Sequence, residues 1–210
     1  VLDGKHALGL NALSLKTRFQ NNRIETLLDS GTRFGRINAD LGIGNAFGGN
    51  IAAAPIGGRI TVSLPDFGAF KPFLPTTVQN ITGNLNADAH IGGRVGSPSV
   101  NATVNGSSNY GKINGNITIG QSNSFSTSPL GGKLNLTVAD AEVFRNFLPV
   151  GQTVKGSLNA AVTLGGNIAN PHLGGSINGE KLYYRNQSQG IILDNGSLRS
   201  HIEGRKWIID

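Results

Sequence analysis

The sequence predicts an all-β fold: a long, curved or folded, antiparallel or mixed sheet that forms an open trough with an apolar interior. Two observations lead to this prediction. Apolar and polar residues alternate with a period of two along most of the chain, which is typical of strands with one apolar and one wet face. Glycine is also abundant, at 31 of 210 residues, while charged residues make up only 14%, against about 25% in an ordinary soluble domain.

The composition excludes several other classes of protein. Each Gly in a helix interior costs about 1 kcal/mol relative to Ala, so a helical bundle is disfavoured. Collagen is excluded because the chain has only 8 Pro and its Gly residues do not recur at every third position. A hydrophobic fraction of 38% and a net charge of +6 argue against disorder. The chain has no Cys, which excludes disulfide scaffolds and thiolate metal sites.

The positive charge does not predict a nucleic-acid partner. The 18 Lys and Arg residues are spread singly along the chain, with neither a cluster of like charges nor aromatic residues interleaved among them. We interpret them as a solvated basic face.

The alternating segments define the expected strands, which lie at residues 36–43, 59–64, 81–91, 113–119, 134–138 and 154–164. At about 3.3 Å per residue, the longest of them reach roughly 30 Å or more. Gly-Gly and Asn-Gly steps are typical of hairpin turns. We therefore expect turns at several such steps, namely Gly48-Gly49, Gly57-Gly58, Gly92-Gly93, Asn105-Gly106, Gly131-Gly132, Gly165-Gly166 and Asn195-Gly196.

An internal repeat organises the chain. Residues 57–106 and 131–179 share a Phe-Leu-Pro step, a Leu-Asn-Ala step, a Gly-Gly pair and a final Asn-Gly step, and Gly58 and Gly132 lie 74 positions apart. We interpret residues 1–210 as a single all-β domain with repeats at approximately 33–106 and 109–179 and a partial repeat at 180–210. The chain opens in mid-pattern and closes on an apolar segment, so we expect a fragment of a longer repeat protein.

Each repeat contains one segment that breaks the period of two. At residues 140–149, apolar side chains fall at helical spacing between Asp140, a candidate N-cap, and Pro149, a stop signal. Residues 66–75 form the equivalent segment. The pattern predicts one short amphipathic helix per repeat, acting either as ordinary core or as a plug over a groove. The candidate plug residues are Phe70, Phe73, Phe144, Phe147 and Leu148.

The apolar face of the expected strands carries small and aliphatic residues and hardly any aromatic ones. Such a face either lets two sheets approach closely or leaves a lined cavity. Long strands with small inward residues favour a trough that suits acyl chains or other amphipathic guests. The candidate lining residues are Ile37, Leu41, Ile60, Val62, Leu64, Ile81, Leu85, Ala87, Ile91, Ile117, Leu134, Leu136, Val138, Val154, Leu158, Ala160, Val162 and Leu164.

No residue pattern indicates catalysis, a cofactor or a metal. The four His are far apart and have no Cys or carboxylate companions at ligand spacing. Residues 42–48 have the wrong glycine spacing for a dinucleotide loop, and the chain has no Gly-x-Ser-x-Gly elbow. We therefore predict a protein that is not an enzyme and has neither catalytic nor metal-binding residues.

A longer pattern of strand, Gly-Gly, Pro and strand occurs twice, at residues 83–106 and 156–179. With residues 190–198, it resembles the C-terminal domain of the TamB family, the translocation and assembly module subunit. More broadly, it resembles the AsmA-like, bridge-type lipid-transfer proteins. The second copy and its continuation read GSLNAAVTLGGNIANPHLGGSING and GIILDNGSL.

The resemblance implies a β-taco with an apolar interior. It implies the periplasmic part of a protein anchored in the inner membrane of a diderm bacterium. It also implies phospholipid transfer to the outer membrane, or assembly of outer-membrane proteins such as autotransporters, with a TamA-like outer-membrane barrel as partner. This chain shows neither the family's anchor nor the C-terminal end that meets TamA. We therefore expect any contact with TamA to be made by the full-length protein.

Three hypotheses follow. The first is a groove for phospholipid or another amphipathic guest. The second is a chaperone that docks outer-membrane β-strands by edge pairing. The third is a structural β-solenoid or adhesin whose protein core is closed. Open strand edges and an exposed apolar face also predict edge-to-edge self-association of the fragment.

Overall fold

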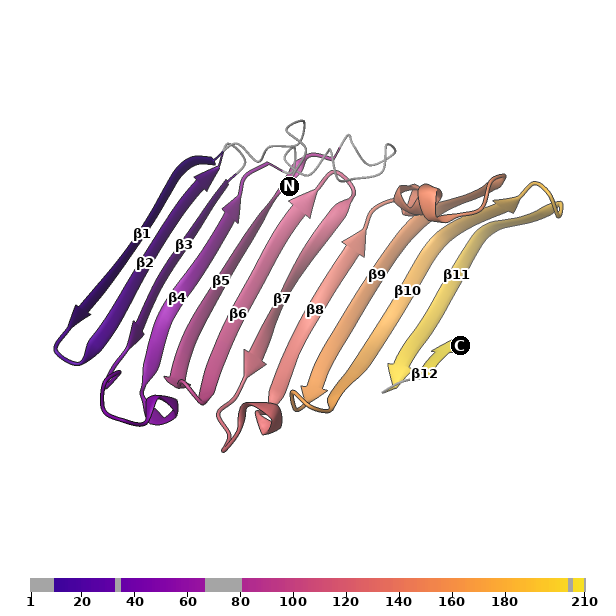
Figure 1. Ribbon diagram of the computed structural model, residues 1–210. Helices are drawn as coiled ribbons and strands as arrows, with labels where there is room; N and C mark the ends of the chain where they lie inside the picture. Colours follow the sequence, from indigo (N-terminus) through magenta and orange to yellow (C-terminus); the bar gives the residue numbers. More distant parts are fainter. Residues whose placement is uncertain (1–9, 33–34, 67–80, 204–205, 210) are drawn as a thin grey trace.

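The computed structural model describes residues 10–32, 35–66, 81–203 and 206–209, which form one antiparallel sheet of twelve strands in sequence order (Figure 1). The all-β prediction is confirmed. The strands are β1 (Leu10–Gln20), β2 (Arg23–Thr32), β3 (Gly35–Ile43), β4 (Ile56–Leu64), β5 (Gly83–Arg94), β6 (Ser97–Ser108), β7 (Gly111–Ile119), β8 (Leu130–Val138), β9 (Gln152–Gly166), β10 (Pro171–Asn186), β11 (Ile191–Glu203) and β12 (Lys206–Ile209). Within the described segments, three short 3₁₀ helices interrupt the strands, namely η2 (Ile51–Ala53), η5 (Phe125–Thr127) and η6 (Ala141–Phe147).

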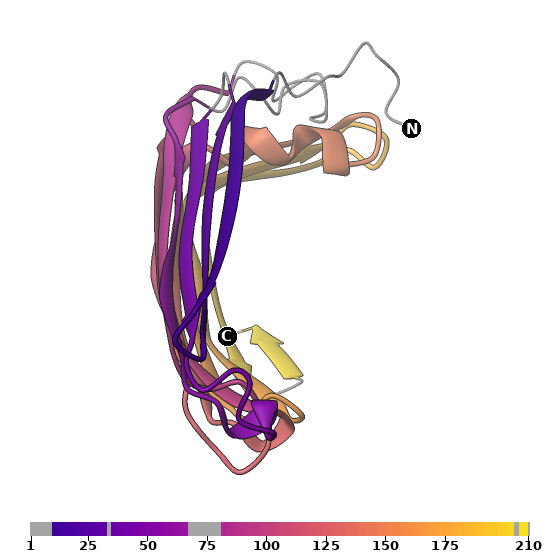
Figure 2. The same ribbon diagram turned by 60° about the vertical axis from the view of Figure 1, so that its left-hand side comes forward.

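The sheet is open and arched. Each strand pairs with its sequence neighbours, so that β1 and β12 lie at the two ends of the strand order. Figure 2 views the arch from the side, with η6 projecting on the hollow side. The described residues form no second layer, so they leave the apolar face of this sheet without a covering element.

The strand register gathers the alternating residues on two separate faces. Rows of directly paired residues run across the sheet without changing face. One such row crosses eight strands from β3 to β10, through Ile37, Val62, Ala87, Val104, Gly115, Leu134, Val162 and Gly175. We call the face that carries this row the inner face, and the polar face opposite it the outer face.

Two loops at one end of the strands make the same kind of backbone hydrogen bond to a later hairpin. The loop that contains η2 and the loop that contains η5 each end on a small buried residue, Ala54 in one and Ser128 in the other. The carbonyl of each accepts a hydrogen bond from a later hairpin, at 2.9 Å from the amide of Val95 and at 3.1 Å from the amide of Ile168. These bonds satisfy backbone groups that strand pairing leaves free.

Six of the seven glycine steps expected to form turns lie inside strands, so the expectation was wrong for them, whereas Gly48-Gly49 lies in the loop between β3 and β4. Gly57-Gly58 belongs to β4, Gly131-Gly132 to β8, and the two Asn-Gly steps to β6 and β11. The two-residue turn between β1 and β2 instead uses Asn21 and Asn22, both with positive φ, as a type I′ turn requires. The strand expected from Ile81 begins at Gly83.

Gly156 shows why glycine is needed within a strand. Its φ is +113°, and a Cβ atom at this position would lie 2.7 Å from the carbonyl oxygen of Lys181. Opposite Gly156, β10 carries a bulge between Glu180 and Tyr183. Bulges bend strands and increase their twist. Gly156 therefore admits the bulge at the point where β9 and β10 run toward η6.

We expect Gly156→Ala to lower the free energy of unfolding by about 2 kcal/mol, because a side chain there meets both backbone strain and a neighbouring strand. Gly165→Ala is the matched control in the same strand, since nothing lies within 4 Å of its Cβ position. Chemical denaturation measures both variants. Equal stability of the two would contradict this account of the bulge.

Candidate functional site

The inner face forms an apolar surface that crosses the sheet from β1 to β10. On β1 and β2 it begins with Leu13, Leu15 and Leu28, and on β10 it reaches Leu173 and Ile177. Its middle contains many small residues. In one row, Ile60, Ala89, Ala102, Ile117 and Gly132 follow one another on β4 to β8. The small residues make this part of the inner face shallow.

Most side chains of this surface are half-buried, and few are fully shielded from solvent. Among the described residues, only Ala54, Val138 and Ala141 are buried apolar residues. Large side chains near the middle of the sheet are well exposed, with Ile117 at 44% and Leu136 at 39%. A conventional β-sandwich would bury such residues under a second sheet. The described residues provide no second sheet, so this apolar face is left uncovered on the hollow side of the arch (Figure 2).

The register places almost all of the predicted lining residues on the inner face. Ile81 precedes β5 and lies outside any strand. The other predicted residues share the inner face, namely Ile37, Leu41, Ile60, Val62, Leu64, Leu85, Ala87, Ile91, Ile117, Leu134, Leu136, Val138, Val154, Leu158, Ala160, Val162 and Leu164. Their role as contacts for a guest molecule stays a prediction.

Sequence reasoning missed the part of the inner face formed by β1 and β2. Leu13, Leu15 and Phe19 are more than half exposed there. These residues occupy odd-numbered positions, so they follow the same period of two that identified the later strands. Thr17 and Thr26 interrupt the apolar series on these strands, which weakens the signal.

The predicted helix at residues 140–149 is present as η6, in the 3₁₀ form. Asp140 is its N-cap, and a carboxylate oxygen accepts a hydrogen bond from the backbone amide of Glu142 at 3.0 Å. Ala141 is almost completely buried, whereas Phe144 is exposed. This helix lies beside one end of the inner face and leaves most of that face uncovered (Figure 2).

The remaining candidate plug residues have different placements. Leu148 caps the C-terminal end of η6. Phe147 belongs to η6, but its side chain lies outside the part of the chain that the structure describes. Phe70 and Phe73, in the equivalent segment of the first repeat, also fall outside the described residues.

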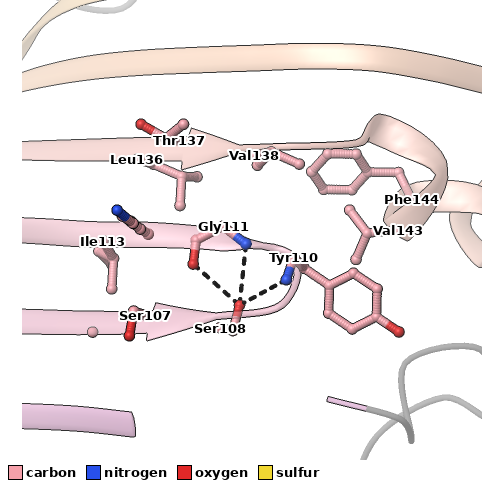
Figure 3. A pocket seen from close by; sticks show the side chains of 12 residues that line it. Ser107, Ser108, Tyr110, Gly111, Ile113, Leu136, Thr137, Val138, Val143 and Phe144 are labelled. Atoms are coloured by element: carbon pink, nitrogen blue, oxygen red, sulfur yellow. Dashed lines mark hydrogen bonds between the residues drawn. The ribbon is translucent and has the colours of Figure 1, made fainter. Parts of the chain in front are cut away.

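A pocket of about 310 Å³ lies where η6 meets the inner face (Figure 3). Ile113, Leu136 and Val138 approach it from the strands, and Val143 and Phe144 approach it from η6. At its edge, the hydroxyl oxygen of Ser108 accepts hydrogen bonds of 3.2 Å from the amides of Tyr110 and Gly111. This bonding fixes the β6–β7 turn at the edge of the pocket, which is an apolar recess at one end of the inner face.

The outer face holds the few clustered charged groups. The carboxylate of Asp88 pairs with the guanidinium of Arg59 at 2.6 Å and with the imidazole of His90 at 3.0 Å. His90 therefore has a carboxylate companion, contrary to the expectation from sequence. Within the described part of the chain, no group of three or more His, Cys, Asp or Glu residues is placed to hold a metal ion.

A family comparison bears on the region that contains the pocket. Residues 101–178, from β6 to β10, match the family model described as TamB, N-terminal domain. This match supports a TamB-family protein. It corrects the expectation of the C-terminal domain, because the matching family model is the N-terminal one. Strand and glycine patterns that recur along a repeated sheet identify the type of sheet better than a position within it.

Comparisons with curated proteins and with solved structures found no match. Among the described residues, no helix has the length and hydrophobicity needed to cross a membrane.

We expect Asp140→Ala to lower the free energy of unfolding by about 1 kcal/mol, the usual cost of losing an N-cap. The amide of Glu142, which loses its acceptor, should exchange with deuterium faster. Asp140→Asn keeps a side-chain oxygen and should retain most of the stability. Unchanged exchange at Glu142 in Asp140→Ala would contradict the assigned cap.

Proposed function

We propose that this chain is a periplasmic segment of a TamB-type envelope protein, and that its apolar groove carries phospholipid between the inner and outer membranes. The observation that favours this function is an apolar inner face that no second layer of the described residues covers, so that most of its side chains are only half-buried. An apolar surface of this extent is unfavourable in water and suits a guest that is itself apolar. The family match to residues 101–178 agrees with an envelope function of the TamB type.

The geometry fits acyl chains in particular. The strands of 9–16 residues in the middle of the sheet run across the groove, and successive strands extend it in the perpendicular direction. Because the lining is aliphatic and shallow, it offers area for contact without specific polar groups. Such a surface accommodates chains of different lengths, while the phospholipid headgroup remains at the open side in water.

In this proposal, a TamA-like outer-membrane partner acts through the longer protein. The same groove also suits the apolar face of an outer-membrane protein before its assembly. A structural adhesin with a closed protein core fits less well, because the described residues form an open sheet with few buried apolar side chains.

The proposed groove predicts a difference between two adjacent positions on β7. Ile117 lies on the inner face and is 44% exposed, whereas Asn116 lies on the outer face and is exposed. We expect Ile117→Asp to reduce bound phospholipid roughly tenfold, because a carboxylate against acyl chains loses its hydration. Asn116→Asp introduces the same charge on the same strand and should bind lipid normally.

Mass spectrometry of lipids extracted from the purified variants measures this effect, and circular dichroism checks that both remain folded. Failure of the unmodified protein to carry lipid, or equal lipid content in the two folded variants, would contradict the lipid groove.

Edge pairing with outer-membrane β-strands is the second candidate function. The observation that favours it is β1, an 11-residue strand at the end of the sheet whose inner-face residues Leu13, Leu15 and Phe19 are exposed. No other strand of the described residues pairs with the outer edge of β1. Such an edge offers backbone donors and acceptors to an incoming strand, and its apolar face continues the proposed groove.

Edge pairing predicts that a photoreactive residue at Ser14, on β1, forms cross-links with an unfolded outer-membrane protein added to the purified chain. The same residue at Ser107, within the paired strand β6, is the control and should form none. Equal cross-linking from the two positions would count against this function.

A further inference from the structure

We propose that the end of the sheet formed by η6 and the β10–β11 hairpin docks on a phospholipid bilayer. This inference goes beyond the lipid groove, since a groove can carry lipid without its own protein segment binding a membrane. Figure 1 shows η6 and the β10–β11 hairpin at the same end of the strands. We call this region the hairpin end.

The hairpin end exposes consecutive apolar side chains. Ile191, Ile192 and Leu193 follow directly after the turn, and Ile192 and Leu193 are 61% and 59% exposed. Val150, just before β9, is fully exposed. The amide of Gln187 in the hairpin turn donates a 2.9 Å hydrogen bond to the carbonyl of Gly151. This bond holds the neighbourhood of Val150 beside the hairpin.

The apolar side chains point to both faces of the hairpin. Successive residues of a strand alternate, so Ile192 points to the face opposite that of Ile191 and Leu193. A protein partner that packs against one face of the hairpin would leave the other face in water. A bilayer surrounds an inserted tip from both sides, so an apolar tip of this kind fits the interfacial region of a membrane.

Basic side chains lie beside the apolar tip. Arg185 is directly opposite Ile192 on the neighbouring strand. Arg185 and Arg145 of η6 line one recess of about 590 Å³, together with Val150. A guanidinium group can bind a phosphate with two parallel hydrogen bonds. Phospholipid phosphates would therefore meet the two arginines when the apolar tip enters the boundary below the headgroups.

The nearby carboxylates leave these contacts available. Glu142 lies 3.8 Å from Arg145, but both side chains are largely exposed, and such surface pairs are weak. Asp194 and Glu180 lie further along the hairpin strands than Arg185, on the side away from the turn. Tyr184, opposite Leu193, adds an aromatic ring of the kind enriched at membrane interfaces.

Co-sedimentation with vesicles of phosphatidylethanolamine and phosphatidylglycerol in equal parts tests the docking. The unmodified 210-residue chain should sediment with the vesicles. Arg185→Gln should weaken binding roughly fivefold, which corresponds to about 1 kcal/mol for one basic residue at an anionic surface. Lys16→Gln, on exposed β1, is the control and should leave binding unchanged.

The apolar tip has its own pair of variants. The double variant Ile192→Ser with Leu193→Ser should lose more than about tenfold in vesicle binding. Leu27→Ser, at a 49% exposed position on β2, should bind vesicles as the unmodified chain does.

Because the chain has no Cys, a single labelled cysteine reports insertion directly. An environment-sensitive fluorophore on Ile192→Cys should shift to shorter wavelength when vesicles are added, and the same label on Leu27→Cys should not. Absence of sedimentation, equal shifts at the two positions, or equal binding of the hairpin variant and its control would overturn the proposal. Lipid extracted from the purified chain tests the groove separately, so failure of one proposal is distinguishable from failure of the other.

Discussion

The structure depends on one constraint: a wide antiparallel sheet has an apolar face, and the described part of the chain does not cover it. Burying an apolar side chain is worth about 25 cal/mol per Å² of area removed from water. The inner face gains only part of that free energy, because its side chains contact one another laterally and remain open above. Backbone pairing between neighbouring strands and the buried loop residues Ala54 and Ser128 therefore contribute a larger share of the folding free energy than such features contribute in a sandwich. The uncovered face is also what makes the sheet suitable for an apolar guest.

Glycine has a different role from the one its abundance first suggests. Positions such as Gly111 and Gly175 lie on the inner face, where a Cβ atom would overlap the carbonyl oxygen of the neighbouring strand. Glycine at these positions therefore permits close approach between strand backbones, in addition to leaving the surface shallow. At Gly156 it permits a bulge in β10. Bulges of this kind bend a sheet, and the hollow shape of the arch brings η6 and the groove to the same side.

The sequence was sufficient to predict the fold class and most of the inner face, because a period of two assigns side chains to faces before any strand is paired. Ile37, Leu85 and Leu158 illustrate this directly. The turns were less predictable. A Gly-Gly pair fits a turn and also fits a crowded position within a strand, and only the pairing of β4 with β3 places Gly58 inside the sheet. The recess shared by Arg145 and Arg185 could not be read from the sequence, because it depends on the placement of η6 beside the end of β10.

The central claim is that the inner face is open to lipid in the cell, and site-specific photocross-linking tests it most directly. A photoreactive amino acid at Leu134 would report on the inner face, and the same amino acid at Lys133, the preceding residue of β8, would report on the outer face. The account predicts phospholipid adducts at position 134 and none at position 133, as identified by mass spectrometry. Protein adducts without lipid at position 134 would show that a polypeptide covers the groove, and would contradict the account.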